Sequence, residues 1–257
     1  MQNSFVTDAI NLKSYNLSES DKIVVMYSKD KGLIRGVAKG VKKPKSKLGA
    51  RMDLLVANKL MLHKGRNLDT ICQAEVLNSF YKTRQDIDKI CYSSYIAEVV
   101  NNFGVEEDPC SEKIYELLYK ALDAVSLSEN KVEIMIAVIK FQLKMMIESG
   151  FSIELDECLC CHSTIEQENM YFVPHLGGII CEKCASKIVH PKKQMPFKMR
   201  DFFKQMALND FDFKGDYELR ANEKVCEVTF EALKSYIEMK SPKKFKTTDV
   251  LYQLPVS

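Results

Sequence analysis

The sequence predicts an α+β fold in two domains. We expect a five-stranded OB-fold barrel over residues 1–78 and a helical domain over residues 79–257, with an inserted four-cysteine zinc ribbon at about residues 155–190. Three observations predict this fold. Short apolar and β-branched runs fill the first 76 residues, the apolar period then changes to helical spacing, and two Cys-x-x-Cys pairs interrupt the helical part. A chain of 257 residues is long enough for two cores.

The barrel is predicted from five short runs separated by turn signals. Asp30-Lys31-Gly32 and the stretch 64–67 are hairpin-type breaks. Five short strands in so few residues suit a small barrel, closed or nearly closed, and the OB-fold is the five-stranded example. The predicted strands cover residues 5–12, 22–28, 33–38, 54–63 and 68–76.

The second half has the three- and four-residue spacing of helices. Asp108-Pro109 supplies a helix start, and Gly150 follows a helix end. The longest apolar stretch, 132–147, contains charged residues, which favours a buried core helix over a membrane span. Nine cysteines and no recognisable signal peptide predict a reducing, cytoplasmic location. The predicted helices cover residues 87–99, 109–127, 131–149, 198–208 and 222–239.

The two Cys-x-x-Cys pairs predict a zinc site. Cys158 and Cys161 form the first pair, and Cys181 and Cys184 form the second after nineteen residues. Four thiolates fill a tetrahedral shell, so we expect one structural Zn²⁺ per chain with no position open for water. Between the pairs, residues 171–173 predict a strand and Gly177-Gly178 a turn. Several alternatives stay open: reduced buried thiols without metal, Cys160 in place of Cys158 or Cys161, or a shell of three cysteines and one histidine, His162 or His175.

Catalytic motifs that use such cysteines are missing from the sequence. No histidine is followed two residues later by Glu, and no Pro precedes either pair, so the zinc-deaminase signature fails. No phosphate loop of the G-x-x-x-x-G-K-[ST] type and no H-E-x-x-H motif occur. We therefore expect no enzyme, no catalytic residue and no small-molecule substrate.

The positive charge is concentrated in the predicted barrel. Residues 1–76 carry 14 Lys or Arg against 7 Asp or Glu, although the whole chain is only +2. This asymmetry predicts a polyanionic partner for the barrel. The densest stretch, residues 35–51, has no acid, and we expect a long mobile loop that projects from the barrel edge. Its cations are the predicted DNA contacts: Arg35, Lys39, Lys42, Lys43, Lys45, Lys47 and Arg51.

Aromatic residues that could stack on bases are few in the barrel region. Residues 1–76 contain Phe5, Tyr15 and Tyr27, and the chain has no Trp. Binding is therefore predicted to rest on phosphates, to ignore sequence, to accept single- and double-stranded DNA, and to weaken with salt. A charged loop that only improves solubility and a nuclear-localisation-like patch are alternative interpretations of the basic run. A zinc-containing nucleic-acid hydrolase and a zinc-ribbon transcription factor are the competing classes.

Several motifs resemble the RecO family of recombination mediators along nearly the whole chain. They are Gly32 followed by Ala38-Lys39-Gly40 and the run Lys42–Ser46, the link Phe172-x-Pro174-x-x-Gly177-Gly178 between the cysteine pairs, and more loosely the closing basic segment 244–251. The resemblance implies an OB-fold, a helical domain with structural zinc, and a DNA repair protein associated with the nucleoid.

The resemblance also implies an activity and partners. The activity is ATP-independent annealing of complementary strands, with help in loading RecA onto DNA coated by the single-stranded DNA-binding protein. The implied partners are RecR and the acidic C-terminal tail of that coating protein. For the acidic tail, the candidate donors are Lys192, Lys193, Lys198 and the lysines of residues 240–246.

Overall fold

The computed structural model describes residues 4–166, 169–211 and 223–247. The chain divides into two compact units, which are described separately below. Residues up to 127 form the first unit together with the segment from Phe245 onward, and residues 128–244 form the second. No helix in the described ranges is long and apolar enough to cross a membrane.

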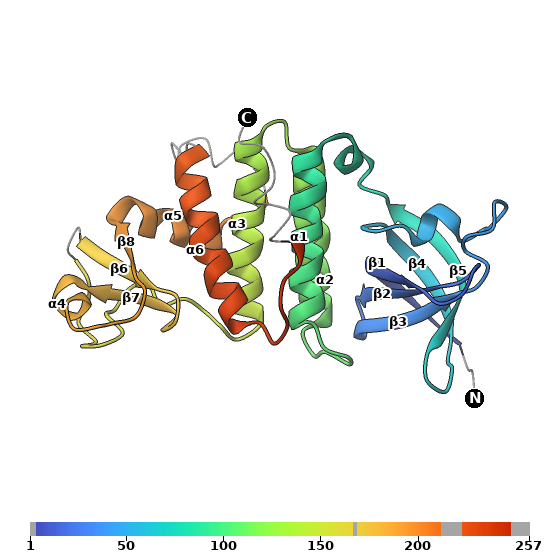
Figure 1. The fold of residues 1–257 in the computed structure, drawn as a ribbon, viewed down its shortest axis with the longest axis horizontal. Helices are drawn as coiled ribbons and strands as arrows, with labels where there is room; N and C mark the ends of the chain where they lie inside the picture. The colour runs from blue at the N-terminus through green and yellow to red at the C-terminus, as the bar shows by residue number, and fades with distance from the viewer. Residues whose placement is uncertain (1–3, 167–168, 212–222, 248–257) are drawn as a thin grey trace. The chain divides into compact units, whose positions relative to one another are not determined.

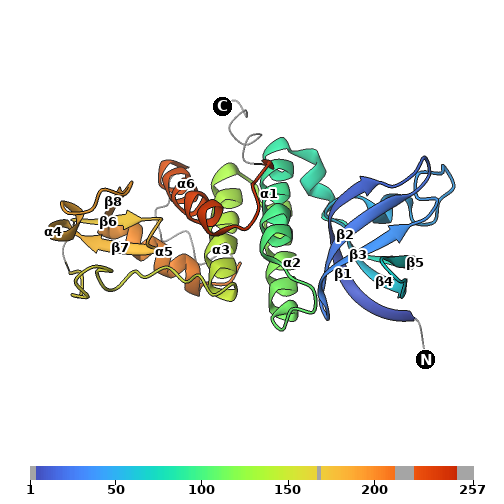
Figure 2. The same ribbon diagram turned by 60° about the horizontal axis from the view of Figure 1, so that its bottom comes forward.

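The first unit contains a closed five-stranded barrel, as predicted (Figures 1 and 2). Neighbouring strands follow the order β1-β2-β3-β5-β4, and β4 returns to β1. All pairs are antiparallel except β3 with β5, which pair in parallel at Gly36–Asp69 and Val37–Thr70. The strands are β1 (Ser4–Asn16), β2 (Lys22–Ser28), β3 (Gly32–Ala38), β4 (Ala57–His63) and β5 (Asp69–Asn78).

The start of β4 differs from the prediction. The strand begins at Ala57 and not at Leu54, because Leu55 has a φ of 64°. This left-handed conformation does not fit an extended strand, and the Leu55 N–H instead donates to the Asn11 carbonyl at 2.9 Å.

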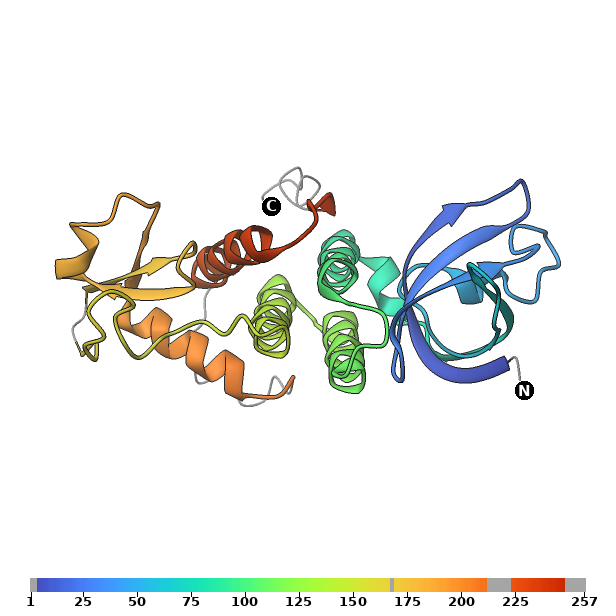
Figure 3. The same ribbon diagram turned by 90° about the horizontal axis from the view of Figure 1, so that it is seen from below.

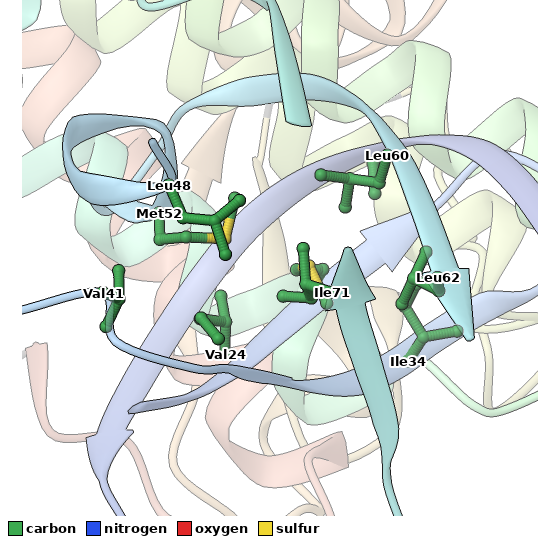
Figure 4. Close-up of a cluster of buried hydrophobic side chains, with 11 residues drawn as sticks. Val24, Ile34, Val41, Leu48, Met52, Leu60, Leu62 and Ile71 are labelled. Atoms are coloured by element: carbon green, nitrogen blue, oxygen red, sulfur yellow. The ribbon is translucent and has the colours of Figure 1, made fainter. Parts of the chain in front are cut away.

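The long connection between β3 and β4 packs into the barrel core. Its apolar side chains Val41, Leu48 and Met52 are buried in one cluster with strand residues such as Val24 and Leu60 (Figure 4). A short 3-10 helix, η1 (Gly49–Met52), brings Met52 inward. The prediction of a loop that projects from the barrel is therefore wrong, because burial of these apolar side chains stabilises the packed form.

Two helices pack against each other and against the barrel within the same unit. They are α1 (Ile87–Phe103) and α2 (Ser111–Leu127), reached from β5 through the 3-10 helix η2 (Tyr81–Gln85). The buried Tyr27 donates from its hydroxyl to Asp108 at 2.9 Å, and Gly32 forms a β-bridge with Glu106. Barrel and helices therefore share hydrogen bonds as well as apolar contacts.

Residues 245–247, near the C-terminal end of the chain, contact α1. The Glu98 carboxylate accepts the N–H groups of Lys246 and Thr247 and the Thr247 hydroxyl, at 2.6 to 3.0 Å. The Phe245 ring lies 5.9 Å from the Tyr95 ring. The family motif that continues from Lys244 to Leu251 lies partly outside the described residues. The barrel ends with β5 at Asn78, and the division into domains of residues 1–78 and 79–257 stays a prediction.

The second unit combines three long helices with a small antiparallel sheet of order β7-β6-β8. α3 packs against α5 and α6, which lie on two sides of it (Figure 3). The predicted strand before Pro174 and the turn at Gly177 are confirmed, and Gly177 has a φ of 81°. The elements are α3 (Lys131–Glu148), β6 (Asn169–Val173), β7 (Gly178–Cys181), α4 (Glu182–Ala185), β8 (Lys193–Pro196), α5 (Phe197–Leu208) and α6 (Glu223–Lys240).

We expect Gly32→Ala to destabilise the first unit by at least about 2 kcal/mol. Gly32 has a φ of 66°, and an added Cβ would lie 2.4 Å from the Val105 carbonyl oxygen. Urea unfolding followed by circular dichroism measures the change. Gly49→Ala is the matched control, since nothing lies within 4 Å of its Cβ position. Equal effects of the two substitutions would contradict the proposed close approach at Gly32.

Candidate metal centre and nucleic-acid interface

Four cysteine sulfurs gather at one point of the second unit. Cys158 and Cys161 precede β6, Cys181 ends β7, and Cys184 lies on α4. Their sulfur atoms all lie within 4.8 Å of one another, and the Cys161 and Cys181 sulfurs are 3.9 Å apart. Sulfurs bound to one tetrahedral ion at about 2.3 Å each would have a similar spacing. The donor set therefore fits a single thiophilic metal ion.

The alternative ligands considered from the sequence do not join this group. Of the residues that the structure describes, the cluster of metal-binding side chains contains neither Cys160 nor His162. His175 lies in the turn after β6 and stacks on His190, with ring centroids 4.4 Å apart. The geometry therefore selects the four cysteines of the two pairs.

Backbone hydrogen bonds fix the first cysteine pair against β7. The Leu159 N–H donates to the Ile179 carbonyl at 3.0 Å, and the Cys181 N–H donates to the Cys158 sulfur at 3.3 Å. His162 closes the tight turn: its φ is 57°, and its N–H donates to the Cys158 carbonyl at 2.8 Å. The site is thus organised by the chain around it.

Hydrogen bonds to the sulfurs favour the thiolate at two of the four cysteines. The Ser163 hydroxyl and N–H lower the pKa of Cys161 to about 6. Burial opposes ionisation of Cys158, but N–H groups of Cys181, Cys160 and Cys161 outweigh it and lower its pKa. In contrast, a hydrogen bond with Cys181 and burial raise the pKa of Cys184. Thiolates are the form that binds metal, so part of the site is prepared for an ion.

The structure separates one of the seven predicted DNA contacts from the other six. Arg35 lies on β3 and pairs with Glu106 at 2.8 Å. The remaining six follow one another along the β3–β4 connection. Five of these are exposed lysines, and Arg51 is half-buried at η1. We name residues 39–51 the basic connection.

The beginning of the basic connection is tied to the β1–β2 turn. Gly40 has a φ of 62°, and its N–H donates to the Asp21 carboxylate at 2.7 Å. The Lys42 N–H donates to the Ser20 carbonyl at 3.1 Å, and the Lys42 ammonium donates to the Ser18 carbonyl at 2.9 Å. The hydrogen bond from Gly40 is the main reason why the pKa of Asp21 lies below its usual value.

The end of the basic connection is held by two buried asparagines. The side-chain amides of Asn11 and Asn58 both donate to the Arg51 carbonyl at 2.8 Å. The Arg51 guanidinium in turn donates to the Lys47 carbonyl. Both ends of the connection are therefore fixed, and its lysine side chains extend from an anchored backbone.

Acids of the helical part neutralise the cations at the β2–β3 end of the barrel. Lys29 pairs with Glu112 and Glu116, and Lys31 pairs with Glu107. In the described ranges, no ion pair involves the cations of the basic connection. The same holds for three exposed cations that the sequence reasoning missed: Lys59 on β4, and Lys64 and Arg66 in the β4–β5 turn. The Lys64-Gly65-Arg66 turn signal was the sequence feature that could have identified two of them.

Few aromatic rings accompany these cations. Tyr27 is fully buried and hydrogen-bonded to Asp108, so it is not a stacking platform. Tyr15 is 51% exposed, and the Lys13 ammonium lies 5.3 Å from its ring. The barrel therefore offers mainly cations to a polyanion.

Comparison with known proteins identifies both halves of the chain. The family model "Recombination protein O N terminal" matches residues 1–80, and "Recombination protein O C terminal" matches residues 84–249. The DNA repair protein RecO of Desulforamulus reducens is 31% identical over 247 residues, which cover 96% of this chain and 93% of the relative. That of Rubrobacter xylanophilus is 34% identical and covers 69% and 70%. That of a Thermoanaerobacter species is 30% identical and covers 96% and 97%.

We expect Asp21→Ala to loosen the basic connection, because the Gly40 N–H loses its acceptor. Amide exchange of residues 40–43 should become faster by about an order of magnitude at neutral pH. Since the pKa of Asp21 is lowered from 3.8, the wild-type protection should persist above that pH and disappear as pH falls through the lower folded value. Asp53→Ala changes an exposed acid at the end of η1 and is the control. Unchanged exchange in Asp21→Ala would contradict this anchoring role.

Proposed function

The chain belongs to the RecO family of DNA repair proteins, and from this premise we propose that it binds single- and double-stranded DNA without reading sequence and anneals complementary strands without ATP. One observation supports this most: the basic connection carries six cations on an anchored backbone and has no ion-pair partner in the part of the chain that the structure describes. Such a surface suits phosphates of any sequence.

Annealing then follows from charge neutralisation. Two strands repel each other through their phosphates, and lysines that replace condensed counterions lower this repulsion. A surface with few stacking rings leaves the bases free to find their complements. We propose no catalytic step for the chain; the alternatives are a zinc-containing hydrolase of nucleic acids and a zinc-ribbon transcription factor.

We further propose one structural zinc ion, held by Cys158, Cys161, Cys181 and Cys184. Zn²⁺ prefers a tetrahedral thiolate shell and, when bound, would join the turn before β6 to β7 and α4. The four thiolates leave no open coordination position, so the role assigned to the ion is stabilisation of the ribbon.

The proposed partners follow from family membership. They are RecR and the acidic C-terminal tail of the single-stranded DNA-binding protein, during loading of RecA onto coated DNA in the nucleoid. A hollow of about 560 Å³ at the start of α5 supports tail binding, since Lys198 and Phe197 line it with an apolar and a cationic surface. Glu166 also lines this hollow and would have to face away from an acidic tail.

Reversal of four lysines tests the DNA surface. We expect the combined change of Lys42, Lys43, Lys45 and Lys47 to Glu to weaken binding of single-stranded DNA about 100-fold at about 0.1 M salt and to abolish annealing, because four phosphate contacts become repulsive. Fluorescence anisotropy and strand pairing by energy transfer measure the two effects.

The matched control reverses four exposed lysines elsewhere, Lys82, Lys113, Lys187 and Lys193, for the same change in net charge. Equal losses in the two variants would assign the effect to net charge and refute the surface. The same assays separate the classes: strand cleavage with Mg²⁺ would support a hydrolase, and one preferred duplex sequence would support a transcription factor.

Removal of one thiolate tests the metal. We expect Cys181→Ser to reduce bound zinc well below one ion per chain and to lower the melting temperature of the ribbon, while DNA affinity changes little. Elemental analysis and calorimetry give the two values. Cys160→Ser removes a neighbouring thiol outside the cluster and should keep its zinc. Loss of DNA binding in a Cys181→Ser protein that still folds normally would mean that the cysteine cluster touches DNA.

A further inference from the structure

A hollow of about 640 Å³ lies on the barrel beside the basic connection. Three cations line it: Lys47 and Arg51 from the basic connection and Lys59 from β4. Val6 on β1, Met61 on β4 and Gln73 on β5 line it as well. The volume is in the range of pockets that hold small organic ligands. The rest of the lining is largely apolar, with one acid, Glu75.

The apolar part is a cross-strand row on one face of the barrel. Val6 pairs with Met61, and Met61 pairs with Gln73, so the three side chains are neighbours on one face. Val6 is 56% exposed, so its side chain is accessible to a ligand in the hollow. The row therefore presents the aliphatic group of Val6, the thioether of Met61 and the amide of Gln73, in that order.

The β5 edge beside the hollow is free of strand partners. β3 pairs with β5 only at Asp69 and Thr70, and among the residues in view no strand pairs with that edge farther along. Residues 72–75 of this strand line the hollow. An unpaired strand edge offers hydrogen bonds to a ligand that lies along it.

The cations are not equivalent. Lys59 stands in register between Asp8 and Glu75, which offset its charge. Arg51 is held by its bond to the Lys47 carbonyl and by Asn11 and Asn58 on its own carbonyl. Arg51 and Lys47 are thus the cations that remain for an anionic ligand, and Arg51 is already fixed in place.

We propose that this hollow holds one unstacked nucleotide of a single DNA strand. A phosphate binds Lys47 and Arg51, the base lies on Val6 and Met61, and Gln73 and Glu75 face its polar edge. The inference rests on the proposed DNA binding and deepens it, since a duplex keeps its bases stacked and cannot fill the hollow. Charge complementarity and continuity with the basic connection select a nucleotide over an uncharged ligand.

The test compares two oligomers with equal phosphate numbers and different bases. Full-length protein is titrated with a fluorescent twelve-residue oligothymidylate and with its abasic analogue, in the same buffer. We expect the wild type to bind oligothymidylate about fivefold more tightly than the abasic analogue. This difference is smaller than the one that stacking on an aromatic ring would give. Val6→Asn and Met61→Gln should each bring this ratio close to one and leave the abasic affinity unchanged, because no charge is altered.

Val76→Asn is the matched control, since Val76 is 45% exposed on β5 and does not line the hollow; its ratio should stay at the wild-type value. A ratio of one in the wild type would overturn the nucleotide site while leaving phosphate binding intact. A wild-type ratio in both Val6→Asn and Met61→Gln would also overturn it. Failure of the proposed function gives a different result, because the quadruple lysine variant would then bind both oligomers as tightly as the wild type does.

Discussion

The burial of Val41, Leu48 and Met52 in the barrel core is the contact on which the rest of the first unit depends. A segment with six cations repels itself and gains little from its own packing. Three apolar side chains in the core supply a free energy of several kcal/mol, enough to hold the segment against the barrel. The Asp21 and Asn11–Asn58 hydrogen bonds then set its two ends. The lysines stay close to the barrel because their backbone is anchored at both ends, and the hollow lies where η1 packs next to β5.

A second constraint is the distribution of the barrel's excess positive charge, because ion pairs neutralise some of its cations and not others. Acidic residues after α1 and on α2 pair with Lys29, Lys31 and Arg35, and the Tyr27–Asp108 hydrogen bond fixes the same junction. These ion pairs are partly exposed and stabilise the junction only weakly. Their larger effect is electrostatic, since they leave the uncompensated cations on the basic connection and the β4–β5 turn. The β2–β3 turn is thereby neutralised, whereas the basic connection, which follows the other end of β3, keeps its charge.

The sequence was sufficient for features that depend on local pattern. Strand runs, helix periods and the cysteine spacing are short-range signals, and the five strands, the helices and the sulfur cluster follow them. Packing of the basic connection could not be predicted, because charged residues dominate its composition. Burial of Val41 and Leu48 depends on strand residues that are far away in the sequence. Pairing of Arg35 with Glu106 joins residues that are far apart in the chain. Lys59 was missed for the same reason, since its neighbours lie on other strands.

The two units also differ in what stabilises them. The barrel buries a core of its own, whereas the ribbon is a sheet of three short strands whose buried side chains, such as Phe172, pack against Phe203 of α5 and Tyr236 of α6. Sheets of that size are marginal in water, and an ion held by the four cysteines would add a link between the turn before β6, the end of β7 and α4. The N–H bonds to Cys158 and Cys161 already bias two sulfurs toward thiolate, so little reorganisation is needed when a cation arrives. A closed thiolate shell is chemically quiet, and this suits a unit whose proposed task is to keep its shape while phosphates are bound elsewhere in the chain.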